Sequence, residues 1–294
     1  MSKNESTLAR INKETELHRR ALIQKIQDHM TKTAEKPYRV ISYMARFDVP
    51  AANILPQDAI MFREAFEQLG KPENLAMVIH SPGGVIEATE KIGLLLREHV
   101  KELMIVVPDS AKSAATMLAL MGNEIHMSDL SELGPIDPQI VAGLDPNTGT
   151  SVFRPAWSII NTPFNLQDMW KKGGLDPNIV ALLAKSLDPT LLDVAQNALD
   201  LATAIAEGWL TKYMGISSSD AKRIAADLTD ASKFHSHGRS IRYPEAKNLG
   251  LKVVKMSPEL EQLSFELYLR SMRVLRDRRV KLVDWDSGGL AADM

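Results

Sequence analysis

Short apolar runs alternate with helix-like segments from about residue 38 to residue 128, and this alternation constrains the fold more than any other feature. Strands are predicted at 39–45, 75–80, 103–108 and 124–127, and helices at 60–69, 86–99 and 113–121. Apolar strands of this length, separated by helices, are typical of βαβ units. The pattern therefore predicts an α/β fold with a mostly parallel sheet core and helices flanking both faces.

The segments on either side of this core differ from it in composition. Residues 1–36 are polar and at best weakly amphipathic, which predicts a solvated helix that packs on a neighbouring element or a sister subunit. The main domain is expected to span 37–256. Ser257 precedes a proline, as at a helix start, and predicts a C-terminal helical segment over 257–283. A flexible tail is expected over 284–294.

The pattern breaks between residues 134 and 165, where Gly, Pro, Asn, Asp and Thr punctuate the chain. These residue types predict a long loop, and long loops inside compact domains are usually functional. Residues 176–213 are predicted to be largely helical, with an interruption near Pro189.

Composition and charge exclude several classes of function. The 294 residues include no cysteine, which excludes disulfides, thiolate metal sites and a cysteine nucleophile. The formal charge of −2 argues against a dedicated nucleic-acid binder. We find no metal-ligand spacing and no phosphate-binding loop, so neither a metal nor a cofactor is predicted. No apolar stretch is long enough to span a membrane and the N-terminus lacks the apolar core of a secretory signal, so we expect a cytoplasmic protein.

Two motifs follow predicted strands of the sheet, where open α/β sheets bind ligands. The first is His-Ser-Pro-Gly-Gly at 80–84, whose glycines let backbone N–H groups approach a ligand; it is otherwise a plain strand-to-helix turn. The second is Asp-Ser-Ala-Lys-Ser-Ala-Ala-Thr at 109–116. Ser113 opens an apolar helix there, which suits either a nucleophile or a simple helix cap.

Together these motifs, with Ser-Glu-Leu-Gly-Pro-Ile-Asp-Pro-Gln at 131–139, resemble the Clp/crotonase superfamily. Within it, the chain most resembles the serine dehydrogenase proteinase family, relatives of signal peptide peptidase A. The likeness extends over about 38–256, including a helix at 193–198 and a histidine-containing segment at 235–241. The resemblance implies a Clp/crotonase-like ββα-spiral and a homo-oligomer.

The resemblance also implies a serine peptidase-type site acting on a peptide or protein substrate. Ser113 falls on the family's nucleophile position. Gly83, Gly84 and the backbone of Ala114 fall on its oxyanion-hole positions. The implied reaction is acyl transfer, in which the serine attacks a peptide carbonyl and water then cleaves the acyl-enzyme.

The general base is left open by the sequence. Relatives use a histidine with a carboxylate or a lysine whose pKa is lowered by burial. The candidates are Lys171, Lys172, His237 and, as a carboxylate, Asp137. Lys112 adjoins Ser113, but we discount it because adjacent side chains point in different directions.

Two other functions remain alternatives to a peptidase. Ala114-Ala115 stands where the family commonly has Gly-Gly, and Asn197 stands where relatives often have lysine. These departures favour a catalytically degenerate oligomeric binding or scaffold protein. An acyl-CoA enzyme with the same oxyanion hole is the other alternative. The basic run at 270–281 is interpreted as a solvated helix end, with contact to an acidic partner as the alternative.

Overall fold

The computed structural model describes residues 7–185, 187–276 and 279–293. Its helices in these residues are α1 (Thr7–Ala34), η1 (Pro50–Ala52), α2 (Asp58–Leu69), α3 (Ile86–His99), α4 (Ala114–Ala119), α5 (Ala156–Lys171), α6 (Pro177–Ala184), α7 (Pro189–Lys212), α8 (Ser218–Thr229), α9 (Ala231–Phe234), α10 (Tyr243–Leu249) and α11 (Pro258–Val274). The helices predicted at 60–69, 86–99 and 113–121 are confirmed within a few residues.

A seven-stranded sheet forms the centre of the described chain, in the order β10-β5-β3-β2-β1-β11-β12. Its strands are β1 (Arg39–Ala45), β2 (Asn74–His80), β3 (Glu102–Val107), β5 (Glu124–Met127), β10 (Val253–Lys255), β11 (Arg279–Trp285) and β12 (Gly289–Asp293). Strands β10, β5, β3, β2 and β1 are parallel, whereas β11 and β12 add an antiparallel edge. The predicted α/β fold with a mostly parallel sheet is confirmed.

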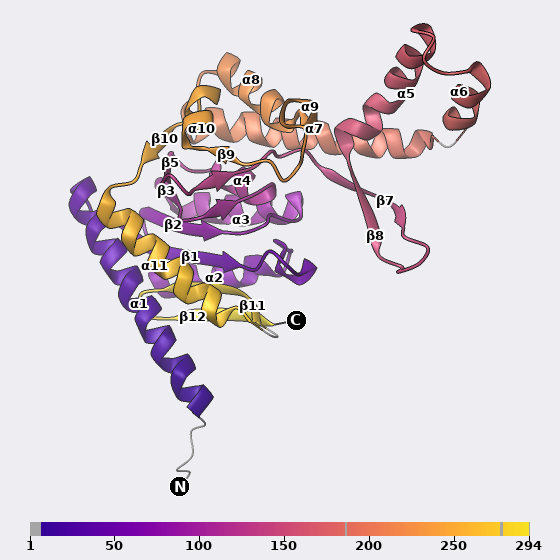
Figure 1. Ribbon diagram of the computed structural model, residues 1–294. Helices are drawn as coiled ribbons and strands as arrows, with labels where there is room; N and C mark the ends of the chain where they lie inside the picture. Colours follow the sequence, from indigo (N-terminus) through magenta and orange to yellow (C-terminus); the bar gives the residue numbers. More distant parts are fainter. Residues whose placement is uncertain (1–6, 186, 277–278, 294) are drawn as a thin grey trace.

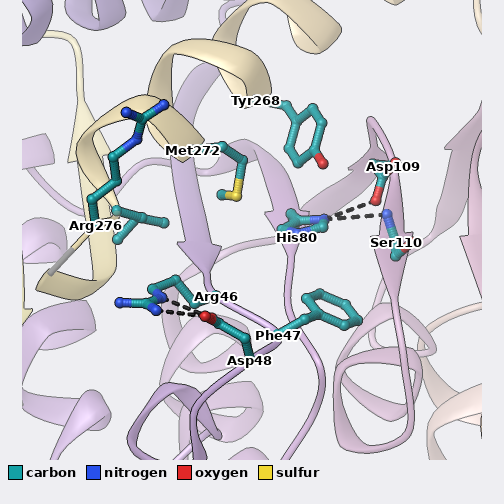
Figure 2. A pocket seen from close by; sticks show the side chains of 10 residues that line it. Arg46, Phe47, Asp48, His80, Asp109, Ser110, Tyr268, Met272 and Arg276 are labelled. Atoms are coloured by element: carbon teal, nitrogen blue, oxygen red, sulfur yellow. Dashed lines mark hydrogen bonds and ion pairs between the residues drawn. The ribbon is translucent and has the colours of Figure 1, made fainter.

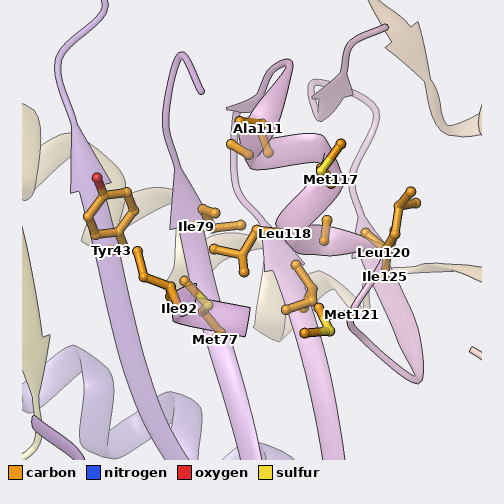
Figure 3. Packing of buried hydrophobic residues seen from close by; sticks show 14 of the residues in the cluster. Tyr43, Met77, Ile79, Ile92, Ala111, Met117, Leu118, Leu120, Met121 and Ile125 are labelled. Carbon is orange, nitrogen blue, oxygen red and sulfur yellow. The ribbon is translucent and has the colours of Figure 1, made fainter. Parts of the chain in front are cut away.

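Alternate residues of the central strands face two different hydrophobic clusters. Met77 and Ile79 belong to the cluster that packs on α2, α3 and α4 (Figure 3). Ala76 and Val78 belong to the cluster that packs on α1 and α11. In Figure 1 these two long helices lie side by side over one face of the sheet. The sheet is thus buried on both faces, which explains why its strands appear in the sequence as nearly continuous apolar runs.

The segment predicted as a long loop, 134–165, is instead largely ordered. It forms the hairpin of β7 (Gln139–Leu144) and β8 (Ser151–Pro155) and enters α5. Figure 1 shows this hairpin, α5 and α6 projecting from the body as an arm, with α7 returning to it. The Asp-Pro-Asn-Thr-Gly run is the hairpin turn, so its turn residues marked the tip and hid the two strands beside it.

The C-terminal prediction is wrong in two respects. Helix α11 ends at Val274, well before residue 283, and residues 284–293 form the ends of β11 and β12 instead of a flexible tail. The Asp-Ser-Gly-Gly run at 286–289, expected to be part of the flexible tail, contains the turn of this hairpin. Trp285 N–H donates to Gly288 O there at 2.9 Å. Residues 1–6, 186, 277, 278 and 294 of the predicted segments lie outside the described residues.

The interpretation of the basic run at 270–281 as a solvated helix end is wrong for its last member, Lys281. It lies on β11 and is 1% exposed. Its Nζ lies 2.7 and 2.8 Å from the two carboxylate oxygens of Asp58, and it also donates to Asn53 O at 2.8 Å. Tyr43 donates its hydroxyl hydrogen to the same carboxylate. This pair ties the antiparallel edge to the start of α2.

Replacing Lys281 with methionine is expected to lower the free energy of unfolding by about 3–5 kcal/mol, because Asp58 would keep a buried charge without its cation. Arg279→Met is the matched control on the same strand. Arg279 and Asp293 are both solvent-exposed and 3.8 Å apart, so its cost should be about 0–1 kcal/mol. Urea unfolding of both variants measures the difference, and equal costs would contradict a stabilising buried pair.

Candidate active site

Ser113 occupies a strained turn between a short strand and a helix. Strand β4 (Ser110–Ala111) ends two residues before it, and α4 begins directly after it. Its backbone has φ 51° and ψ −122°, outside the regions that L-residues normally adopt. Such strain clusters at functional sites, and a serine on a sharp strand-to-helix turn is the geometry of a nucleophile elbow.

The alternative that Ser113 merely caps α4 is wrong, because its side chain makes no capping hydrogen bond. The turn is instead held by Thr116, whose hydroxyl donates to Ala111 O at 2.6 Å and accepts from Gly134 N–H at 2.9 Å. Ser113 is half-buried, and its hydroxyl is not used to cap α4. This leaves it available for chemistry.

The two glycines of the first motif pass against this turn. Gly83 has φ +98°, and a Cβ on it would lie 2.8 Å from both Ala114 N and Ser113 Cβ. Gly84 packs equally closely on the backbone of Ile54. Only glycine permits these approaches, which explains the Gly-Gly pair physically. The backbone of 83–84 and the start of α4 thus adjoin the serine, as an oxyanion hole requires.

A small sheet brings three distant segments to one edge. Strand β4 pairs in parallel with β6 (Glu132–Leu133), which pairs antiparallel with β9 (Ile241–Arg242). Because of these directions, the chain leaves the sheet at the same end when it runs from Ala111 to Ser113, from Leu133 to Asp137, and backwards from Ile241 to His237. Ser113, Asp137 and His237 therefore all lie beyond the same edge of this small sheet, the edge at which these three strand ends meet.

Two of these candidates contact each other directly. His237 Nδ1 lies 2.8 Å from Asp137 Oδ1. Asp137 is fully buried, whereas the His237 side chain is 31% exposed. In serine-hydrolase triads, a buried carboxylate holds one nitrogen of the imidazole in the same way.

Gln139 completes this cluster and was missed from the sequence. Its Nε2 lies 2.9 Å from Asp137 Oδ2 and 3.1 Å from His237 Nδ1. The shorter contact assigns the Nδ1 proton of His237 to Asp137, which leaves Nε2 with a lone pair. Gln139 then donates to the second oxygen of the carboxylate. Its position in the Pro-Ile-Asp-Pro-Gln run was the available signal.

Lys112, discounted as a base from the sequence, points away into a structural contact. Its Nζ lies 2.8 Å from Glu132 Oε2 and donates to Leu133 O and Ser240 Oγ at 3.1 and 3.2 Å. It thereby joins the three segments of the small sheet. These contacts give Lys112 a structural place in the small sheet.

Lys171 and Lys172 lie at the end of α5, on the projecting arm, and both are exposed. Lys172 Nζ bonds Asp168 at 2.8 Å, which raises the pKa of the lysine. A lysine base needs the opposite shift. The assignment of either lysine as the base stays a prediction that nothing in this arrangement favours.

Within residues 7–185, 187–276 and 279–293, no group of three or more His, Asp or Glu side chains is arranged to hold a metal ion. In that part of the chain, no helix has both the length and the apolarity to cross a membrane.

Two similar proteins come from Methanocaldococcus jannaschii, and both are uncharacterized. One is 28% identical over 230 residues, which are 77% of this chain and 70% of the relative. The other is 29% identical over 205 residues, 68% of this chain and 60% of the relative, so the match spans less than two thirds of that protein.

Two solved structures of the 1510-N membrane-bound stomatin-specific protease are also similar. A serine-to-alanine mutant gives a TM-score of 0.43 at 16% identity, over 69% of this chain and 74% of that one. A lysine-to-alanine mutant in complex with a substrate peptide gives 0.41 at 17%, over 74% and 73%.

The family comparison covers a little less than half of the chain. Residues 17–156 match the ClpP-like SDH-type serine proteinase family. The matched span contains Gly83, Ser113 and Asp137, whereas His237 lies beyond it. The match over residues 17–156 confirms the resemblance to the serine dehydrogenase proteinase family that the sequence motifs indicated.

Proposed function

We propose that the chain is a serine peptidase in which Ser113 is the nucleophile, His237 the general base and Asp137 its orienting carboxylate. The observation that carries the proposal is the shared edge of the small sheet, from which these three residues extend. The 2.8 Å contact between His237 and Asp137 supports the assignment of base and orienting group. The match to a serine proteinase family supports the reaction class.

The chemistry follows the acyl-transfer scheme. Ser113 Oγ forms a bond to the peptide carbonyl carbon while its proton passes to His237 Nε2. The carbonyl oxygen takes up the negative charge, and N–H groups of the 83–84 turn and of Ala114 stabilise it. The C–N bond then breaks, and the amine leaves with the proton from the imidazole. Water next attacks the ester carbonyl while the imidazole takes up its proton, and the C–O bond breaks to release the acid and free Ser113.

Labelling with a fluorophosphonate probe tests the nucleophile directly. We expect the probe to modify Ser113, located by mass spectrometry of the digested protein, because only an activated serine attacks phosphorus at a useful rate. Ser219→Ala is a control at an exposed serine on α8 and should label as the wild type does. Absent or unselective labelling would favour the degenerate binding protein instead.

A further inference from the structure

A pocket separate from the Ser113 turn opens at the carboxyl ends of β1, β2 and β3, below α11 (Figure 2). Its volume is about 660 Å³, within the range of roughly 300–1,000 Å³ typical of small-ligand sites. Such strand ends are where open α/β sheets bind ligands. No part of the proposed acyl-transfer step uses it.

The pocket and the serine lie on opposite faces of the sheet. His80 follows Val78 in the alternation of β2 and therefore faces α11, where it packs on Tyr268. Helix α4, which begins after Ser113, packs in the cluster on the other face. The pocket is thus a site of its own, although the strands that form its floor continue into the 83–84 turn and into Ser113.

Aromatic rings line the middle of the pocket. The His80 ring is sandwiched between Phe47 and Tyr268, with ring centroids 4.7 and 4.6 Å away. Phe47 is 47% exposed and lines the pocket, so part of its ring is open to a ligand there. Met272 of α11 adds a polarizable apolar surface beside these rings. This part of the pocket suits an apolar or aromatic group.

The two ends of the pocket carry opposite charges. At one end, the contact between His80 Nδ1 and Asp109 Oδ2 holds the pKa of Asp109 below its usual range, so the carboxylate is ionised and can accept an N–H. At the other end, Arg46 is already paired with Asp48. Arg276 is exposed and forms no salt bridge within the described residues. Figure 2 shows Arg276 and Asp109 on opposite sides of the view.

We propose that this pocket binds an apolar carboxylate, with its acid group on Arg276 and its apolar body against Tyr268 and Phe47. The two sources of such a group are the free C-terminal end of a peptide and a free carboxylic acid. Asp109 already contacts His80 and Ser110, but a carboxylate has further acceptor sites, and a backbone N–H of a peptide end can occupy one of them whereas a free acid has no such N–H. The pocket goes beyond the proposed peptidase activity and does not depend on it.

Isothermal titration with three probes tests the site: N-acetyl-alanyl-phenylalanine, its C-terminal amide and 3-phenylpropanoate. We expect the peptide acid to bind at least about tenfold more tightly than the amide, because a charge-assisted bond to Arg276 is lost in the amide. Arg276→Gln should remove this difference, whereas Arg273→Gln, an exposed arginine on α11 that does not line the pocket, should keep it.

Three outcomes would overturn the proposal: equal binding of the peptide acid and its amide, no binding of any probe, or equal effects of the two arginine variants. Binding of 3-phenylpropanoate as tightly as the peptide acid supports the site and identifies a free acid as the source. Titrating Ser113→Ala separates this test from the proposed function: binding should persist there, and its loss would place the probe in the serine site instead.

Discussion

Replacing Ser113 with alanine is expected to lower the rate of peptide hydrolysis by about 10³-fold or more, because the variant has no group that can form the acyl-enzyme. Hydrolysis of casein or of a quenched fluorescent peptide library measures the loss. The fold should be unaffected, since the Ser113 side chain makes no capping bond and Thr116 holds the turn. An unchanged urea midpoint would verify this.

Two results would contradict that prediction. A Ser113→Ala variant with wild-type turnover would exclude the acyl-enzyme route and favour carboxylate chemistry such as that of an acyl-CoA enzyme, which thermal stabilisation by acyl-CoA would reveal. If neither protein hydrolyses any peptide while peptide binding persists, the chain is a degenerate scaffold. Ser219→Ala, on the surface of α8, controls for the effect of removing a serine hydroxyl.

The central fold was predictable from the sequence because its strands are buried on both faces. Residues 75–80 and 103–107 are therefore nearly continuous apolar runs, and the helices between them follow a helical period. The arm hairpin has strands with largely exposed faces, as in β7 and β8, so it carries no such signal. The C-terminal strands were missed for a related reason: their turn contains two glycines, which also suit a frayed end.

Ser113 could be proposed as the nucleophile from the sequence because the evidence for it is local. Gly83 and Ser113 each lie in a short motif after a strand, and the backbone demands of the turn select those residue types. His237 and Asp137 were also among the sequence candidates, but their pairing was not predictable, because they are 100 residues apart in the sequence. They are brought together through β6 and β9, strands of two residues that are too short to show any periodicity. Only the pairing of the small sheet shows that the segments share an edge.

The Ser113 turn and the pocket under α11 lie on different faces of the central sheet. The 83–84 turn and Ser113 adjoin α4, whereas His80 and Asp109, which belong to the same two connections, face the pocket under α11. Ser110 joins the two sides, since its N–H donates to His80 Nδ1 at 3.3 Å and its carbonyl accepts from Ser81 N–H at 3.0 Å. A ligand in the pocket would therefore contact the segments that position the nucleophile.

Replacing His237 with asparagine should reduce hydrolysis nearly as much as Ser113→Ala does, because the serine would have no acceptor for its proton. Asp137→Asn should cost about 10²–10⁴-fold, since an amide that donates to Nδ1 would favour the tautomer with its proton on Nε2. The matched control is His235→Asn, two residues away in the same segment and exposed. It should keep wild-type turnover.

Non-additivity separates this catalytic unit from a structural role. When residues act as one unit, the second loss adds little, so a Ser113→Ala/His237→Asn double variant should be no slower than either single variant. If His237→Asn instead retains wild-type turnover, the histidine is not the base, and Lys171→Met and Lys172→Met become the decisive variants. His237→Asn could instead lose both turnover and several degrees of melting temperature while His235→Asn loses neither. In that case the contact between His237 and Asp137 stabilises the fold. Turnover measured well below the melting transition then decides whether the contact also serves the reaction.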